Sequence, residues 1–524
     1  MTNTVLSALG LTLGYAEQSL LLSSVDLHLP PVPMALVGRN GVGKSTLLRC
    51  LAKHLTPQSG HITATVPIAY LAQTERDAAP AMTVEEWLGV APALAALDRL
   101  LAGNGSADDL LVLNDRWTLR EDVEAQCAAY GLPTSILAQP MRSLSGGQRT
   151  RLALCRLNPS PETFLLLDEP TNHLDRAGRT WFYDWLFQHP GGALVASHDQ
   201  DLLHRMTHII ELRSGSVFTY GSGWEGYLVS RQQEVARAEA DKAHALRTLK
   251  HEARQLQEAR ERHARRERQG RKKAAQGDAP KILLGMMKAR SEATGGRLKA
   301  QQQDAMEKEQ ARVRRAQDRL EIFDPLHFAL SQPAERAGNL LLAQDLVLPY
   351  VQRAVSLQVD RGERWLIQGP NASGKSVLLQ VLHKTLNPAS GAVQGHYRSV
   401  LLDQHLALLC PHEPAIAAFQ RLNPGWTEQA YRDSLALMRL RRERALLPIQ
   451  ELSGGERLKL ALASVLMGPT TFDLVLLDEP DNHLDLESQH LLASTLSAFK
   501  GTLMVVTHST QMAEALRVDQ RLTF

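Results

Sequence analysis

The chain repeats short apolar runs separated by amphipathic stretches with helical spacing. The runs lie at 34–37, 68–71, 164–167 and 193–196 in the first half, and at 365–367, 400–402, 474–477 and 503–506 in the second. Continuous apolar runs are typical of buried strands in a mostly parallel sheet, and the amphipathic stretches between them favour helices. The same order in both halves predicts two copies of one α/β domain, with ligands at the carboxyl ends of the strands.

One stretch of the first copy departs from this pattern. Residues 83–130 are rich in Ala and Leu with helical spacing, which predicts a helical subdomain. Residues of about 80–143 exceed the matching part of the second copy by about twenty, so they are a candidate for a short additional arm. We expect Trp87 and Trp117, within this region, to lie in its core.

A second stretch joins the two copies. Residues 227–269 contain no Gly or Pro and consist largely of Glu, Arg, Ala, Gln and Lys, the composition of a long helix. Apolar residues recur with 3-4-3 and seven-residue spacing at Leu246, Leu249, Ala253 and Leu256, and again at Met306, Val313 and Leu320. A break at 277–280 between these seams predicts an antiparallel helical hairpin, with an apolar tip at 281–288 flanked by Lys. The predicted domains are therefore 1–222, 223–325 and 326–524.

Charge is segregated along the chain. The 524 residues carry a net charge of +2, but residues 231–320 hold 24 Lys and Arg against 13 Asp and Glu, which leaves the rest acidic. A basic linker between acidic domains indicates a polyanionic partner, most plausibly nucleic acid, although a solvated coiled coil that only tethers the copies remains an alternative.

The four cysteines, at 50, 127, 155 and 410, form no C-x-x-C pair, which argues against a disulfide framework, a zinc module or an iron–sulfur cluster. The N-terminal residues lack the pattern of a signal peptide, and no apolar run approaches 18 residues. These features predict a cytoplasmic protein without membrane insertion.

Each copy has one glycine-rich loop of the phosphate-binding type. Residues 38–46, GRNGVGKST, and 369–376, GPNASGKS, both follow an apolar run and precede a helical stretch, which is the context a P-loop requires. The loop N–H groups and the helix N-terminus would cradle phosphates, Lys44 would reach the β- and γ-phosphates, and the Ser45 hydroxyl would hold Mg²⁺.

Five further motifs follow each loop in the same order. In the first copy they are Gln73, LSGGQ at 144–148, Asp168-Glu169 after a strand, TNHLD at 171–175 and His198; in the second they are Gln404, LSGGE at 452–456, Asp478-Glu479, DNHLD at 481–485 and His508. The ordered set resembles the ATP-binding cassette (ABC) ATPases over nearly the whole chain. The DEPTNHLD string and the long charged linker are similar to those of the ABC-F subfamily, whose members associate with ribosomes.

The resemblance implies ATP and Mg²⁺ as ligands and assigns roles to the matching residues. Polarisation of the attacking water and contact with the γ-phosphate are implied for Glu169, Glu479, His198 and His508. Contacts with Mg²⁺ are implied for Ser45, Gln73, Asp168, Ser376, Gln404 and Asp478. Nucleotide binding is implied for Tyr15, Gly38, Asn40, Gly41, Gly43, Lys44, Ser45, Thr46, Gln73, Ser145, Gly146, Gly147, Gln148, Gly369, Asn371, Gly374, Lys375, Ser376, Val377, Gln404, Ser453, Gly454, Gly455 and Glu456. For Tyr350, stacking on adenine is left open, because it lies closer to its P-loop than Tyr15 does.

In this family two cassettes stack head to tail. The resemblance therefore implies that residues 453–456 close over the Lys44 site and residues 145–148 over the Lys375 site, so that both ATP sites form within one chain. It further implies that ATP-driven closure positions the basic linker near tRNA and the peptidyl-transferase region of the ribosome, in translation or antibiotic resistance.

Two other functions stay open on the sequence. A fused-cassette ATPase subunit of a membrane transporter would share the motifs, but a long basic hairpin between its cassettes is unexpected. The absence of zinc-type cysteine pairs and the modest length of the coil weigh against a DNA-repair or chromosome-organising ATPase. Glu456, Asp481 and Val377 depart from the usual Gln, Thr and Thr, which removes no phosphate-, metal- or water-handling group but allows unequal sites.

Overall fold

The computed structural model describes residues 4–15, 19–73, 82–172, 174–213, 215–275, 311, 330–331, 338–351, 353–403, 406–438, 440, 442–468, 471–482 and 484–524. The chain divides into two compact units, one of Met1–Glu225 with Leu326–Phe524 and one of Gly226–Pro325. Within the first unit we call residues 4–220 the first repeat and residues 338–524 the second repeat. The predicted domain boundaries stay predictions.

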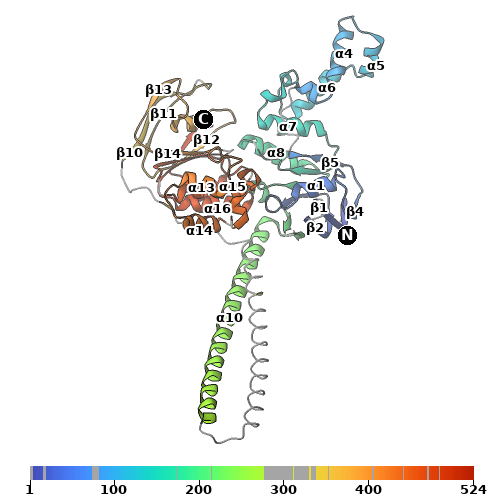
Figure 1. Cartoon of the computed structure of the whole chain (residues 1–524). Coiled ribbons are helices and arrows are strands. Elements are labelled where there is room, and N and C mark those ends of the chain that lie inside the picture. The colour runs from blue at the N-terminus through green and yellow to red at the C-terminus, as the bar shows by residue number, and fades with distance from the viewer. Residues whose placement is uncertain are drawn as a thin grey trace. The chain divides into compact units, whose positions relative to one another are not determined.

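The first repeat is built on a mostly parallel sheet (Figure 1). Its order is β5 (Ile68–Leu71), β6 (Phe164–Asp168), β7 (Ala193–Ala196), β3 (Pro33–Val37), β8 (His208–Arg213) and β9 (Ser216–Tyr220), and β9 alone runs antiparallel to its neighbour. The central strands β6, β7 and β3 carry the apolar runs of the sequence, and their side chains are almost all buried. A parallel sheet covered on both faces is the expected outcome of continuous apolar strands.

A smaller antiparallel sheet completes this repeat, with the order β2 (Ser19–Leu29), β1 (Leu6–Tyr15) and β4 (Ser59–Ala64). Helix α1 (Lys44–Leu51) shares one hydrophobic core with both sheets, because its buried leucines pack with residues of β1, β2 and β6. The P-loop before α1 is thereby fixed at the carboxyl end of β3.

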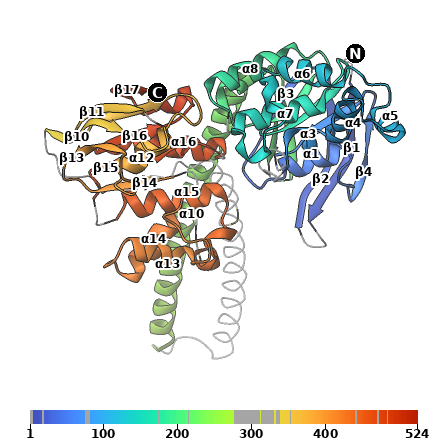
Figure 2. The ribbon, with the colours of Figure 1, turned by 90° about the horizontal axis from the view of Figure 1, so that it is seen from above.

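The second repeat has the same plan (Figure 2). Its parallel sheet runs β14 (Ser399–Leu402), β15 (Leu474–Asp478), β16 (Thr502–Val506), β12 (Arg364–Gln368) and β17 (Gln520–Thr523). Its antiparallel sheet runs β11 (Ala354–Asp360), β10 (Asn339–Val347) and β13 (Ser390–Gln394), with α12 (Lys375–Leu382) packed in the shared core. The predicted α/β class with two copies is confirmed.

Helices make up the remainder of both repeats. The first repeat has α3 (Val84–Trp87), α4 (Ala91–Leu101), α5 (Ala107–Leu113), α6 (Leu119–Ala129), α7 (Gly146–Leu157), α8 (Arg176–Gln188) and α9 (Gln200–Leu203). The second has α13 (Ala415–Leu422), α14 (Glu428–Leu437), α15 (Gly454–Leu466), α16 (Leu486–Ala498) and α17 (Thr510–Ala515). The described residues thus form helices where the Ala- and Leu-rich stretch predicts them.

The two tryptophans of that stretch differ. Trp87 is partly buried beneath the guanidinium of Arg156, whose carbon lies 4.6 Å from the ring centroid. Trp117 is 48% exposed, so the expectation that it lies in the core is wrong. It falls in the turn between α5 and α6, outside the helices whose buried sides form the core of this region.

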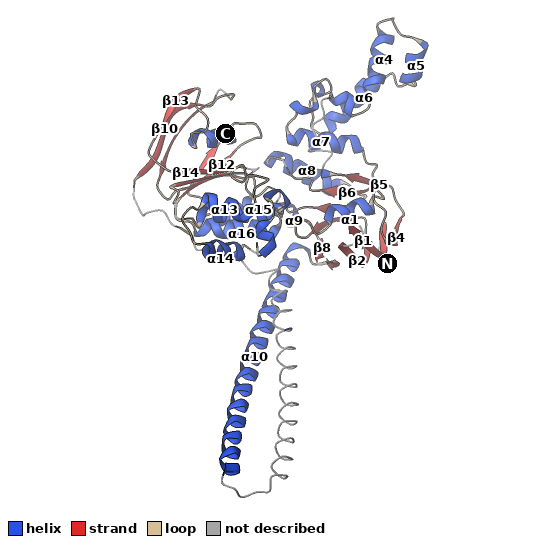
Figure 3. Ribbon diagram, viewed as in Figure 1, coloured by secondary structure: helices blue, strands red, loops and turns tan. Residues whose placement is uncertain are grey.

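The linker contains one long described helix, α10 (Gly223–Ala275), as its composition predicts (Figure 3). At about 1.5 Å per residue a helix of 53 residues is about 80 Å long. The side chains of Leu249, Ala253 and Leu256, the returning half of the predicted hairpin and its tip at 281–288 lie outside the described residues. Among the residues that are described, no helix is both long enough and apolar enough to cross a membrane.

Candidate functional site

The P-loop of the first repeat lies between β3 and α1. Gly43 caps α1 with φ 106°, a left-handed conformation that a glycine adopts without strain. The Lys44 ammonium turns back over the loop and donates to the carbonyl oxygens of Gly38 at 2.7 Å and Arg39 at 3.4 Å. The helix begins at Lys44, so its first N–H groups and its side chain face the same space.

The P-loop of the second repeat has the same geometry. Gly374 caps α12 with φ 102°, and the Lys375 ammonium donates to the carbonyl oxygens of Gly369 at 2.7 Å and Pro370 at 2.8 Å. Ala372 stands at the position of Gly41 and keeps its left-handed conformation, with φ 61°. The strained alanine indicates that the loop shape is imposed by its surroundings.

The ends of β6 and β7 bring further polar groups to the Lys44 site. Nε2 of His198 lies 2.7 Å from the Lys44 ammonium and 3.5 Å from Oε1 of Glu169. Because an ammonium can only donate, Nε2 accepts this hydrogen bond and His198 is neutral. Burial, followed by the charge of Lys44, holds the pKa of His198 well below its usual value. Burial likewise lowers the pKa of Lys44, opposed by Glu169, Asp485 and Asp168.

The Lys375 site has the same kinds of residue, with a longer distance between its histidine and its glutamate. Nε2 of His508 lies 3.8 Å from Oε1 of Glu479, and burial, with the charge of Lys375, lowers the pKa of His508 to about 4. Burial raises the pKa of Asp478, which a hydrogen bond from the Ser376 side chain opposes. A hydroxyl beside a carboxylate at a phosphate-binding loop is a donor set that suits Mg²⁺, a hard cation that prefers oxygen.

Both glutamates are held in a strained backbone conformation. Glu169 has φ 48° and Glu479 has φ 47°, in the left-handed region that non-glycine residues rarely occupy. Their N–H groups donate to the carbonyl oxygens of Ala196 and Val506 on the neighbouring strands, which keeps each turn in place. Strain of about 1–3 kcal/mol at one residue is a frequent property of functional positions.

The two signature segments form the N-termini of α7 and α15. Ser145 and Ser453 cap these helices, and each accepts a hydrogen bond from the N–H three residues on, at Gln148 and Glu456. Capping boxes fix both segments locally. The N-terminus of each helix carries a positive partial charge, which favours an anion at that end.

Each P-loop shares a cavity with the signature segment of the other repeat. Around Lys44 a cavity of about 550 Å³ is lined by Thr46, Gln73, Asp168, Glu169 and His198 of the first repeat, together with Gly454 and Arg457 of the second. Around Lys375 a cavity of about 360 Å³ is lined by Ser376, Val377 and Glu479, together with Ser145, Gly146 and Arg149 of the first repeat. The head-to-tail arrangement implied by the resemblance matches this geometry.

Two aspartates tie each repeat to the opposite P-loop. Asp485 caps α16 by accepting from the N–H of Ser488 at 2.9 Å, and its second oxygen accepts from the N–H of Asn40 at 3.1 Å. Asp175 caps α8 in the same way, and its second oxygen accepts from the N–H of Asn371 at 3.4 Å. Neither residue is among those predicted to bind nucleotide, although both end the repeated NHLD motif.

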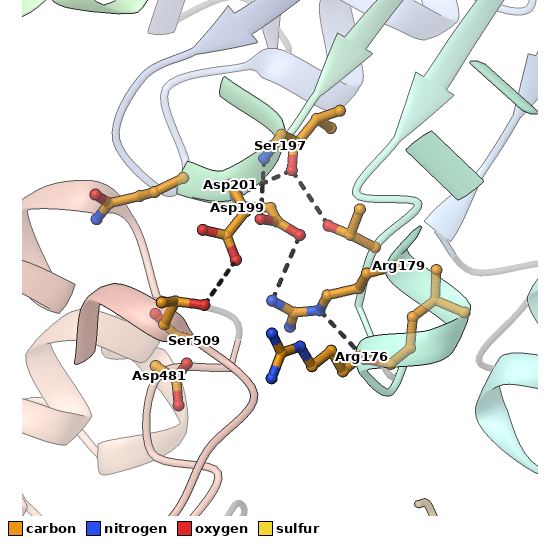
Figure 4. A network of polar contacts seen from close by, with 12 residues as sticks. Arg176, Arg179, Ser197, Asp199, Asp201, Asp481 and Ser509 are labelled. Carbon is orange, nitrogen blue, oxygen red and sulfur yellow. Dashed lines mark hydrogen bonds and ion pairs between the residues drawn. The ribbon is translucent and has the colours of Figure 1, made fainter. Parts of the chain in front are cut away.

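A third contact region lies beside these aspartates (Figure 4). Nη1 of Arg179 lies 3.4 Å from Oδ2 of Asp199, and the Thr510 hydroxyl of the second repeat donates to Oδ2 of Asp201 at 3.4 Å. The Gln200 amide donates to Oε1 of Gln489 at 3.2 Å, also across the two repeats. None of these contacts is predicted from the sequence.

Most predicted site residues that are described take part in these arrangements. Among the described residues, the predicted site residues that line neither cavity are Gly38, Gly147, Gln148, Gly369, Ser453, Gly455, Glu456, Asp478 and His508. Val351 lines the Lys375 cavity, whereas the adjacent Tyr350 is 90% exposed. The side chain of Tyr15 and the whole of Gln404 lie outside the described residues. The roles assigned to all these residues stay predictions. Arg149, Arg457, Asn172 and Asn482 are lining residues that the sequence analysis misses, although each stands in or beside a repeated motif.

Comparison with known proteins yields three kinds of match. A family model described as ABC transporter matches residues 22–172 and 352–482. The tylosin resistance ATP-binding protein TlrC of Streptomyces fradiae is 31% identical over 97% of this chain and 95% of its own, and ABC transporter F family member 4 of Arabidopsis thaliana is 30% identical over 93% and 68%. A solved structure titled as a complex of archaeal ribosomal stalk protein aP1 and ribosome recycling factor aABCE1 has a TM-score of 0.56 at 17% identity, covering 98% of this chain and 87% of that one.

Proposed function

Because the chain belongs to the ABC family of ATP-binding proteins, and to its ABC-F branch, we propose that it hydrolyses ATP and acts on the ribosome. The observation that carries the proposal is the pair of shared cavities. Each contains a P-loop lysine and a strained glutamate, and each is lined by the signature helix of the opposite repeat.

The residues in and beside each cavity suit hydrolysis of a phosphoanhydride. The lysine and the N–H groups of the loop would bind phosphate oxygens, the glutamate would orient the attacking water, and the neutral histidine would meet the γ-phosphate. Ser45, Asp168 and Gln73, with Ser376 and Asp478, offer the oxygen donors that would hold Mg²⁺. When bound, Mg²⁺ would neutralise charge on the β- and γ-phosphates.

The sharing of each cavity supports a closure cycle. A nucleotide bound to one repeat would touch the lid of the other, so its γ-phosphate would hold the repeats together and hydrolysis would release them. This is the property that would make the protein an ATP-controlled switch.

The proposal of a ribosomal target is supported by the positive charge of the linker helix and by sequence similarity to a resistance protein. Helix α10, residues 223–275, carries 14 Lys and Arg against 8 Asp and Glu, which suits an RNA-rich partner. A relative over nearly the whole length is named for tylosin resistance, so translation or antibiotic resistance is the proposed role, in the cytoplasm, with the linker near tRNA and the peptidyl-transferase region. The long helix between the repeats gives no support to the transporter alternative.

The test replaces both glutamates, Glu169→Gln and Glu479→Gln, to block hydrolysis without removing ATP binding. The doubly substituted chain should co-sediment with ribosomes in ATP at least tenfold more than in ADP, because closure would persist. A Lys44→Ala/Lys375→Ala chain, which should not bind ATP, is the control and should stay in the supernatant. Equal sedimentation of the double Gln variant in ATP and ADP would refute the ribosomal assignment.

A further inference from the structure

Asp481 is a buried acid where the first repeat has a neutral residue. It stands at the position of Thr171, whose hydroxyl lies 3.3 Å from the Ser197 hydroxyl; Asp481 instead accepts from the Thr507 hydroxyl at 2.9 Å. Asp481 is 7% exposed, and its other oxygen, Oδ1, has no hydrogen-bond partner among the described residues. A buried carboxylate with one oxygen unsatisfied needs a nearby cation to stay ionised.

Arg179 of the other repeat supplies that positive charge through space. Arg179 and Asp481 line one small cavity of about 30 Å³. Figure 4 shows the Arg179 guanidinium joined to Asp199 of its own repeat and beside the guanidinium of Arg176, with Asp481 of the opposite repeat nearby but in no direct ion pair with Arg179. Burial raises the pKa of Asp481, and Arg179 is the strongest influence that opposes this rise. The position of Arg179 in the second repeat is occupied by the neutral Gln489, so the charged pair exists only once.

Arg179 is also fixed within its own repeat. Its Nε donates to the carbonyl oxygen of Leu174 at 3.2 Å, and Asp199, which Nη1 approaches, accepts from the Tyr183 hydroxyl at 2.7 Å. The guanidinium is therefore held in place by its own repeat alone. A separation of the repeats would leave Arg179 with Asp199 but would remove the positive charge near Asp481.

The chain positions of these acids relate them to both ATP sites. Asp199 follows His198 of the Lys44 site, and Asp481 lies two residues after Glu479 of the Lys375 site. Arg179 pairs with Asp199 behind the first cavity and lines the same small cavity as Asp481 behind the second.

We propose that Arg179 is a positioning residue that couples the two sites, by holding the turn of Asp481 in the closed arrangement of the repeats. This rests on the proposed ATPase, because coupling is meaningful only if both cavities bind ATP. The coupling is asymmetric, since the corresponding pair of positions, Gln489 and Thr171, carries no charge.

The test exchanges residues between the repeats. Arg179→Gln installs the residue of position 489, and Asp481→Thr installs the residue of position 171. We measure the ATP concentration that gives half-maximal ATPase rate in the full chain, with Mg²⁺. Arg179→Gln alone should raise it tenfold or more, because Asp481 is left buried without a cation. Asp481→Thr alone, and the pair Arg179→Gln/Asp481→Thr, should raise it threefold or less, so the second substitution suppresses the first.

Two controls separate this proposal from its alternatives. The half-saturating ATP concentration of Arg179→Lys should stay within threefold of that of the parent chain. Gln489→Ala, which alters the uncharged counterpart of Arg179, should also stay within threefold. If Arg179→Gln folds only together with Asp481→Thr, the proposal is supported. If Arg179→Gln fails to fold with either residue at position 481, the proposal is overturned. It is also overturned if Arg179→Gln raises the half-saturating ATP concentration by the same factor in the parent chain and in the Asp481→Thr chain. A parent chain that does not hydrolyse ATP at all would refute the proposed function, a result visible before any of these variants is compared.

Discussion

At the residue scale the two signature segments differ by one charge. Oε2 of Glu456 accepts from the Ser453 N–H at 3.0 Å and from the Ser453 hydroxyl at 2.8 Å. In the first repeat Gln148 accepts only from the Ser145 N–H, at 2.9 Å, among the contacts of the described residues. A serine hydroxyl has one hydrogen to donate, so if Ser453 binds phosphate as the resemblance implies, Glu456 would compete with the phosphate for that hydrogen.

The positive charge of Arg444 partly offsets the negative charge of the Glu456 carboxylate. Its Nη2 lies 2.6 Å from Oε1 of Glu456, and the corresponding position of the first repeat is the buried Ile136. The pair is partly exposed, with side-chain exposures of 55% and 18%, so we assign it about 0.5–1 kcal/mol. The Lys44 site should therefore bind ATP less tightly than the Lys375 site.

This asymmetry predicts opposite effects of two substitutions. With Glu479→Gln blocking the Lys375 site, Glu456→Gln should lower the half-saturating ATP concentration about two- to fivefold, and Arg444→Ala should raise it by a similar factor. The ATPase rate as a function of ATP concentration measures both. In the Glu169→Gln background, where only the Lys375 site can turn over, neither change should exceed twofold; equal effects in both backgrounds would contradict the assignment.

Some residues of the site can be predicted from the sequence and others cannot. The P-loop lysines and serines, Glu169 and His198 are predictable because their motifs have fixed spacing and local structure. Arg179 and Arg444 are not, because their partners belong to another repeat or another motif and only the tertiary arrangement joins them. Val351, rather than Tyr350, lines the Lys375 cavity because the direction of a side chain in a turn is set by backbone angles that a sequence does not display.

At the element scale the feature peculiar to the first repeat is the pair α4 and α5, which we call the arm, residues 91–113. The bridge from Thr83 to Pro140 encloses about twenty residues more than the matching bridge from Pro414 to Pro448, and the arm accounts for the difference. A capping box at Ser106 and an ion pair between Arg99 and Asp109 fix its two helices.

The arm exposes apolar side chains that a monomeric surface would not need. Leu101 is 71% exposed, Leu111 78% and Leu110 49%, whereas Leu94, Leu97 and Leu113 form its buried side. An exposed apolar surface on a well-capped element indicates a contact with another molecule. We predict that the arm contributes to ribosome binding.

Substitution of this surface tests the prediction. Leu101→Asp/Leu111→Asp in the chain with both glutamates replaced should reduce co-sedimentation with ribosomes in ATP by threefold or more. The melting temperature should be unchanged, since both side chains point into solvent. Leu437→Asp, at a 49% exposed leucine in the second repeat, is the matched control and should have no effect. A loss of the same size in the control would show that the effect is not specific to the arm.

Element types were more predictable than element contacts. Continuous apolar runs predict the parallel strands, and the composition of 227–269 predicts α10, because burial and helix propensity act locally. The antiparallel sheets β2-β1-β4 and β11-β10-β13 were not predicted, since their strands are irregular in register and their apolar spacing is broken by bulges. The exposure of Trp117 was missed because burial of a tryptophan is decided by the fold around it.

At the scale of the whole molecule, each repeat contributes its signature segment to the cavity of the other. Asp485 and Asp175 reach opposite P-loops, Gly454 and Ser145 line opposite cavities, and Arg39 forms an ion pair with Glu487 at 3.3 Å across the same boundary. The aspartate and signature contacts come in pairs because the repeats are copies of one fold, whereas the ion pair has no counterpart, since Pro370 and Ala177 occupy the matching positions. The paired contacts make each site incomplete without the other half.

The most direct test is an experimental structure of the Glu169→Gln/Glu479→Gln chain with bound ATP and Mg²⁺. The account predicts that residues 453–457 contact the ATP held by Lys44, within about 3.5 Å, and that residues 145–149 contact the ATP held by Lys375. Nucleotides bound at both lysines with the signature residues of the opposite repeat making no contact to either would contradict it.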